Sequence, residues 1–256
     1  PALLTGTPKL SAGHFFFNAY RRGLEGDPLF GTFGGPSSEN PWIDVDQIET
    51  MRGEMPARLF AQEILAQFQT AEGLVFRNIA ACKKLGFSRK PTRAIGIDLA
   101  RRADWTVISG VDEDGWLTFF DRFNQVPWPT VEERIVTAAV KAGRSVRITV
   151  DSTGVGDPVV QHLQARGLRV TPYLFTNQSK LALIDNLSIR FENQTVGLPV
   201  DEPYLESELL AFTYETTKAG NTRLAAAEGM HDDAVFSLAL AIWGLRRTGV
   251  GVNIGD

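Results

Sequence analysis

The alternation of apolar and polar residues becomes regular only after residue 92. From there it predicts strands at residues 93–99, 105–111, 116–123, 145–151 and 168–174. The turn residues "DEDG" join the second and third of these strands as a hairpin. Strands joined by short turns are antiparallel, whereas a strand–helix–strand crossover makes its strands parallel. The order therefore predicts a mixed α/β sheet, with three antiparallel strands followed by parallel strands.

Helical patterns lie between and after these strands. They predict helices at residues 131–142, 157–166, about 178–191 and 232–246. Thr130 and Glu133 form a predicted capping box at the start of the first helix, and Asp157 is the predicted N-cap of the second. The last helix is apolar on nearly all sides and is therefore expected to be buried. Before it, residues 209–227 predict a β-hairpin around "KAGN".

The first 90 residues have a different character. Residues 1 to about 40 are rich in Gly and Pro, residues 44–71 carry a rough helical stripe, and residues 83–92 form a basic linker. We place a boundary there and expect two parts, residues 1–90 and residues 91–256. The chain opens in what reads as the end of a strand, so we expect it to be a fragment of a longer chain.

The composition is that of an ordinary soluble globular protein, with 43% hydrophobic and 22% charged residues. No apolar run reaches the length of a membrane span. The single cysteine, Cys82, excludes intramolecular disulfides and a cysteine-based zinc site. The net charge of −4 argues against a nucleic-acid coat protein. An acidic domain can nevertheless bind DNA if metal ions neutralise some of its acids.

Two acids end predicted strands, on the face opposite the apolar side chains. Asp98 ends "AIGID" and Asp151 ends "VRITVD". On parallel neighbouring strands, which lie about 4.8 Å apart, both carboxylates would project from one edge and could bridge two divalent metal ions. Ala94 and Gly96, on the face of Asp98, would leave room for an incoming helix. The alternative for Asp98 is a buried acid that is hydrogen-bonded to a neighbour.

The remaining candidate acids have weaker local signals. Asp232 and Asp233 open the last helix, where acids serve equally well as helix caps or as ligands. Asp104 lies in a turn, where acids are commonly solvated or capping. The glycine-rich "DSTGVGDP" lacks the lysine of a Walker A loop, and the chain contains no G-x-x-x-x-G-K-[ST] motif. The sequence therefore predicts no ATP site of that kind in this chain.

The order of these segments resembles a known family. "IGIDLARRADWTV", "ITVDSTGVGDPVV" and "GMHDDAVFSLALA" are similar to the three acidic motifs of the large terminase subunit of tailed bacteriophages. Upstream, "LLTGTPKLSAGHFFFNAYRRG" resembles the last segment of that family's packaging ATPase, and "LFAQEILAQFQTAEGLVF" resembles the passage into its nuclease domain. The resemblance implies an RNase H-like nuclease domain at 91–256, preceded by a remnant of the ATPase domain and a linker at 1–90.

The resemblance also implies an activity and a set of site residues. The protein would be a metal-dependent endonuclease, a hydrolase that cuts double-stranded viral DNA concatemers during genome packaging. Asp98, Asp151 and Asp233 would be the catalytic metal ligands, with Asp104 and Asp232 as auxiliary ligands. Two ions, Mg²⁺ or Mn²⁺, would promote phosphodiester hydrolysis.

The implied partners are DNA, the portal protein and the small terminase subunit, in the cytoplasm of the infected bacterial host and without a membrane. Cations near the acids are candidates for contacts with DNA phosphates, namely Arg101, Arg102, Lys180, Lys218 and Arg223. Two alternatives remain open at this stage. One is another RNase H-like enzyme, such as a junction resolvase or a transposase, and the other is a non-catalytic portal-docking module whose acids serve only as caps.

Overall fold

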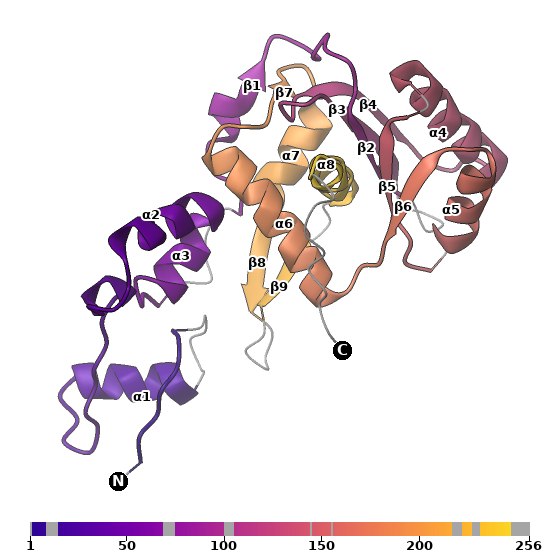
Figure 1. Ribbon diagram of the computed structural model, residues 1–256. Helices are drawn as coiled ribbons and strands as arrows, with labels where there is room; N and C mark the ends of the chain where they lie inside the picture. Colours follow the sequence, from indigo (N-terminus) through magenta and orange to yellow (C-terminus); the bar gives the residue numbers. More distant parts are fainter. Residues whose placement is uncertain are drawn as a thin grey trace.

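A five-stranded mixed sheet lies between two groups of helices (Figure 1). The computed structural model describes residues 2–8, 15–68, 75–99, 105–143, 145–154, 156–216, 222–226 and 231–246, with backbone alone at 156–157, 214–216, 222–223 and 225–226. The sheet consists of β2 (Ala94–Asp98), β3 (Thr106–Val111), β4 (Leu117–Phe123), β5 (Arg147–Asp151) and β6 (Arg169–Tyr173). Its order is β4-β3-β2-β5-β6.

The strand directions match the sequence prediction. β2 pairs with β3, and β3 with β4, in antiparallel fashion, whereas β2–β5 and β5–β6 are parallel pairs. The mixed α/β sheet of three antiparallel strands followed by parallel strands is therefore confirmed. The strands could be predicted from their apolar or alternating sequences, and their directions could be predicted from the lengths of the connections.

Helices cover both faces of this sheet, as Figure 1 shows. On one face lie α4 (Trp128–Ala142) and α5 (Gly156–Ala165), whose apolar side chains share a core with Ile95 and Ile97 of β2. On the other face α8 (Asp233–Gly244) packs directly on the sheet, and α6 (Asn177–Glu192) and α7 (Pro203–Ala211) pack against α8. α8 is buried from Ala234 to Ile242, as its apolar sequence predicts.

Two short pairings and three helices complete the described chain. β1 (Lys83–Lys84) pairs in parallel with β7 (Leu198–Pro199), and β8 (Phe212–Thr216) pairs with β9 (Thr222–Ala226) as the predicted hairpin. α1 (Phe15–Leu24), α2 (Val45–Glu54) and α3 (Ala57–Glu63) lie to one side of the sheet in Figure 1. Among the helices that the structure describes, none is both long enough and apolar enough to span a lipid bilayer.

Segment 75–84, upstream of the predicted boundary, belongs to the core beneath α8. Val75, Phe76, Ile79 and Cys82 are buried in the same cluster as the side chains of α6, α7 and α8. Short 3-10 helices at Ser37–Glu39 and Ile79–Cys82 are the other regular elements in this half of the described chain. The division of the chain into 1–90 and 91–256 stays a prediction, with residues 75–84 packed against the second part.

Three local predictions are wrong. α4 begins at Trp128 after Pro127, so Thr130 and Glu133 do not form its capping box; Pro129 in the first turn presets the helical φ and starts the helix earlier. α5 begins at Gly156, which places Asp157 inside the helix and not at its N-cap. Residues 209–211 belong to α7 and not to the hairpin, because Leu205 and Leu209 extend an apolar helical face there.

Candidate active site

Asp98 and Asp151 end neighbouring parallel strands. Ile97 of β2 lies opposite Val150 of β5, and the two acids follow directly after this pair, at the same edge of the sheet. Both are buried, each with a relative exposure of 8%. The Asp151 carboxylate accepts a hydrogen bond from the backbone N–H of Thr153 at 2.8 Å, which orients it at the start of the following turn. The predicted convergence of these two strand ends is therefore observed.

The start of α8 approaches the same edge because β2 has no side chain at Gly96. A Cβ on Gly96 would overlap the backbone of Ser237 and Ala241 in α8. The Ser237 hydroxyl donates to the carbonyl oxygen of Gly96 at 3.0 Å and lies 2.9 Å from the Ser109 hydroxyl. This close contact confirms the room predicted from the small residues of β2, and it fixes the helix whose first residue is Asp233.

Acids at the end of β5 and at the start of α8 lie near enough to Asp98 to affect its ionisation. Burial raises the pKa of the Asp98 carboxyl well above its usual value, and the charges of Asp233, Asp151 and Asp232 raise this pKa further. Lys180 of α6 opposes the shift. The Asp233 carboxylate also lies 3.6 Å from Nδ1 of His231. The site is therefore a concentration of negative charge with one nearby lysine that influences Asp98.

Lys180 is held beside this cluster by aromatic rings. Its ammonium nitrogen lies 4.4 Å from the ring centroid of Phe236 and 4.9 Å from that of Phe175. Cation–π contacts of this kind hold a cation in a defined place without consuming an acidic partner. Five basic residues were predicted to contact DNA. Of these, Lys180 is the one whose side chain the structure describes, and it lies at the site.

The other predicted site residues fall where the structure gives no side chain. Asp104, Arg101, Arg102 and Lys218 lie outside the described residues, and of Arg223 only the backbone in β9 is described. Their predicted roles stay predictions.

Glu208 of α7 is a site residue that the sequence reading missed. It is buried, and its carboxylate accepts a hydrogen bond of 2.8 Å from the backbone N–H of Ala234, at the start of α8. Burial raises the pKa of Glu208 to about 7, and the charges of Asp233 and Asp232 also raise it; the Ala234 N–H and the charge of Arg122 lower it. The sequence contained one signal for Glu208, because it is an acid on the apolar face that Leu205, Leu209 and Phe212 form.

The residues present suit a hard divalent cation in their chemistry and charge. Buried carboxylates that lie close together require positive charge when ionised, and oxygen ligands are those that Mg²⁺ and Mn²⁺ prefer. Within the described ranges, however, no group of three His, Cys, Asp or Glu residues is arranged to hold a metal ion. The acids thus meet at one edge of the sheet without adopting the geometry of a complete ligand set.

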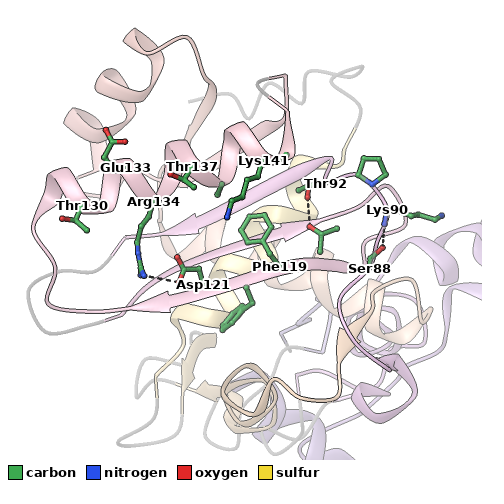
Figure 2. A pocket seen from close by; sticks show the side chains of 15 residues that line it. Ser88, Lys90, Thr92, Phe119, Asp121, Thr130, Glu133, Arg134, Thr137 and Lys141 are labelled. Carbon is green, nitrogen blue, oxygen red and sulfur yellow. Dashed lines mark hydrogen bonds and ion pairs between the residues drawn. The ribbon is translucent and has the colours of Figure 1, made fainter.

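A separate cavity of about 700 Å³ lies between α4 and β4 (Figure 2). Its lining includes Phe119 and Asp121 from β4, and Arg134 and Lys141 from α4. Arg134 is paired with Asp121 at 3.4 Å. Because none of the candidate catalytic acids lines this cavity, it is distinct from the site at the ends of β2 and β5.

Comparison with known proteins identifies the family. No family model matches the chain. The large terminase subunit of Thermus phage G20c is 32% identical over 201 residues, which is 73% of this chain and 41% of that protein. That of Thermus virus P23-45 matches to the same extent. The chain therefore spans 41% of the length of these curated relatives.

Solved structures agree with this assignment. The crystal structure of the large terminase nuclease from thermophilic phage G20c with bound magnesium is 30% identical, with a TM-score of 0.61, and the match covers 68% of this chain and 98% of that one. The large terminase of another thermophilic bacteriophage, only 12% identical, shares the fold, with a TM-score of 0.67 over 90% of this chain and 59% of that one. From its sequence, its RNase H-like fold and these relatives, the chain belongs to the family of phage large terminase nucleases.

Proposed function

We propose that this chain is the nuclease part of a packaging terminase, a metal-dependent endonuclease that cuts double-stranded viral DNA concatemers in the cytoplasm of the infected host. The observation that carries the proposal is the convergence of Asp98, Asp151 and Asp233 from β2, β5 and α8. The G20c nuclease, whose structures are described with bound magnesium, cobalt and zinc, supports the binding of a divalent metal by this chain. Residues 1–90 would then be the end of the ATPase domain and a linker.

Asp98, Asp151 and Asp233 would hold the metal, with Asp232 and Asp104 as auxiliary acids. Two ions, Mg²⁺ or Mn²⁺, would supply Lewis-acid chemistry, lowering the pKa of the attacking water and stabilising the departing 3′ oxygen. Asp98 and Asp151 would together hold the metal, because they end adjacent parallel strands. Asp233 would complete the site from α8, and bound metal would favour the ionised form of Asp98, whose pKa is raised in the metal-free protein.

Contacts with DNA would come from cations around this edge of the sheet. Lys180, which lies over the ring of Phe236, would bind a phosphate beside the acids, and Arg101, Arg102, Lys218 and Arg223 are further candidates. Backbone contacts of this type imply cutting with little sequence preference. In the parent assembly, the portal protein and the small terminase subunit would be the protein partners.

Plasmid cleavage tests this function directly. Supercoiled plasmid incubated with the protein and Mn²⁺ should be nicked and then linearised, and EDTA should abolish both products. The Asp151→Asn variant should cut at least about 100-fold more slowly, because it loses a ligand charge at the site. Isothermal titration should show Mn²⁺ binding to the wild type and much weaker binding to the variant.

Two results would overturn the proposal. A folded wild type that neither binds Mn²⁺ nor cuts plasmid would favour the docking-module alternative. An Asp151→Asn protein that cuts as fast as the wild type would remove the site assignment. Asp121→Asn, which changes an exposed acid paired with Arg134, is a matched control that should cut normally.

A further inference from the structure

The first turn of α8 is capped by a residue from another helix. The N-cap residue of α8, Asp232, makes no side-chain capping hydrogen bond. The backbone N–H of Ala234, the second residue of the helix, instead donates to Oε2 of Glu208 at 2.8 Å. An N-cap side chain ordinarily accepts from the second or third N–H of its helix. Glu208 therefore occupies the place that a local cap would take.

Glu208 is itself held rigidly from the opposite side. Its other carboxylate oxygen lies 3.7 Å from Nη2 of Arg122, a residue of β4. The Arg122 guanidinium lies 3.7 Å from the ring centroid of Trp105 and 4.8 Å from that of Tyr204, one turn before Glu208 on α7. The side chains of Arg122 and Glu208 are only 11% and 4% exposed. This arrangement limits the movement of the Glu208 carboxylate and hence of the N–H that it binds.

The consequence concerns Asp232 and Asp233, the two acids that precede that N–H in the chain. Asp233 directly precedes Ala234, so fixing the Ala234 N–H fixes the backbone from which Asp233 projects. Both Asp232 and Asp233 are close enough to Asp98 to raise its pKa. A local cap formed by Asp232 would direct that carboxylate to the helix N–H groups. Because Glu208 from α7 caps the helix instead, the Asp232 carboxylate is not needed for that role.

We propose that Glu208 is the positioning residue of the site: it caps α8 through Ala234, holds Asp233 toward Asp98 and Asp151, and leaves Asp232 to the carboxylate cluster. The capping stands on the geometry alone, whereas its effect on metal binding and cleavage rests on the proposed nuclease function. The role depends on the reach and the acceptor oxygen of the side chain, not on its charge. That distinction makes it testable.

Three variants separate reach from charge. Glu208→Gln keeps the length and an acceptor oxygen but loses the charge, whereas Glu208→Asp keeps the charge but is one methylene shorter. Glu208→Ala loses both. Glu206→Gln is the matched control, because Glu206 lies on the same helix and pairs with Lys83 at 2.5 Å, away from α8.

Hydrogen exchange of the Ala234 amide, measured in EDTA, reports whether the capping hydrogen bond forms in the absence of metal and DNA. Glu208→Asp and Glu208→Ala should lose protection there by about fivefold, the usual effect of a missing cap, while Glu208→Gln and the control stay within about twofold of the wild type. Mn²⁺ affinity, measured by titration, and kcat for plasmid cleavage should likewise fall in Glu208→Asp and Glu208→Ala. Both should stay near the wild-type value in Glu208→Gln and in the control. Loss of a residue that orients a ligand typically weakens metal binding about 10-fold or more. The KM for DNA should change little.

Every other pattern contradicts the proposal. If Glu208→Gln loses protection as Glu208→Asp does, the charge and not the reach is what matters. If Glu208→Asp retains the protection and the Mn²⁺ affinity of the wild type, α8 does not need this cap. Should Glu208→Ala fail to fold, the Gln and Asp variants still decide between these results. A wild type without Mn²⁺ binding or cleavage would refute the nuclease function, while the exchange at Ala234 would still report the cap.

Discussion

Asp98 lies in the interior with three other carboxylates and one lysine influencing its ionisation. Ionisation of Asp98 is unfavourable there for two reasons. The buried carboxylate loses its hydration, and it is repelled by the neighbouring carboxylates. The alternative of a simple buried acid explains the burial but not the arrival of Asp151, Asp232 and Asp233 at the same place. Under the proposed function, these acids would meet to hold a cation, at the expense of the stability of the metal-free protein.

The metal-free protein should lose stability as the pH rises from about 5 to about 8. Asp98, usually near 3.8, and Glu208, usually near 4.5, both have a raised pKa in the folded state, the latter at about 7. A group with a raised pKa binds its proton more tightly in the folded state than in the unfolded one. The stabilisation from protonation is therefore present at low pH and is lost as the pH rises through the folded pKa. Urea unfolding in EDTA across this range measures the effect.

Asp98→Asn identifies the origin of this pH dependence. The variant should show a shallower fall than the wild type and a Tm at the upper end of the range that is higher by about 2–4 °C for each 1 kcal/mol gained. Asp121→Asn, at an exposed acid, should keep the wild-type slope. An Asp98→Asn protein with an unchanged slope would show that Asp98 is ionised at no great cost in the folded state.

Among the elements, the contact between β2 and α8 decides whether a site exists. β2 contributes Asp98 and α8 contributes Asp233, and Gly96 allows the backbones of the two elements to touch. The hydroxyl of Ser237 then ties α8 to both β2 and β3. A small residue in the middle of a strand marks such a close approach. The spacing of the proposed catalytic acids Asp98 and Asp233 is thus set by the packing of two backbones.

Gly96→Ala should separate these elements. The added methyl group would overlap the backbone of Ser237 and Ala241, so α8 must move away from β2. We expect a loss of about 1–3 kcal/mol in the free energy of unfolding, typical of overpacking, and a loss of Mn²⁺ binding. Urea unfolding and isothermal titration measure the two effects.

Gly53→Ala is the matched control for this change. Gly53 lies in α2, and a Cβ there would meet nothing within 4 Å. The substitution should stabilise the protein by up to about 1 kcal/mol, because alanine is the better helix former. Equal effects of the two substitutions would contradict the account of β2 and α8.

At the scale of the whole molecule, segment 75–84 ties the upstream half of the chain to the sheet. Phe76 stacks against Phe191 of α6 and Phe212 of β8, with ring centroids 5.3 and 5.7 Å apart. β1 then adds to β7. Farther upstream, the N–H of Ala57 donates to Glu192 at the end of α6 at 2.9 Å. The core that supports α8 therefore includes residues before the linker predicted at 83–92.

Two truncations test where the folded unit begins. A protein that lacks residues 1–74 should keep the Tm of the sheet part. One that lacks residues 1–90 should lose several kcal/mol of stability, because each buried apolar side chain contributes about 1.5–3 kcal/mol and Val75, Phe76, Ile79 and Cys82 all leave the core. Thermal unfolding followed by circular dichroism measures both. Equal stability of the two proteins would instead support the predicted boundary after residue 90.

The sequence by itself determined the sheet, its strand directions and the acids at its edge. Strand alternation, turn residues and connection lengths are local properties, so β2 to β6 and the ends at Asp98 and Asp151 were readable, as was the buried helix that begins at Asp233. Tertiary structure decided the rest. Glu208 meets Ala234 across 26 positions of the chain, and Arg122 reaches Glu208 from strand β4. Neither pairing leaves a periodic signal, because contacts between distant segments depend on how whole elements pack. For the same reason only the structure showed that residues 75–84 share the core of α8, and that the cap of this helix comes from α7.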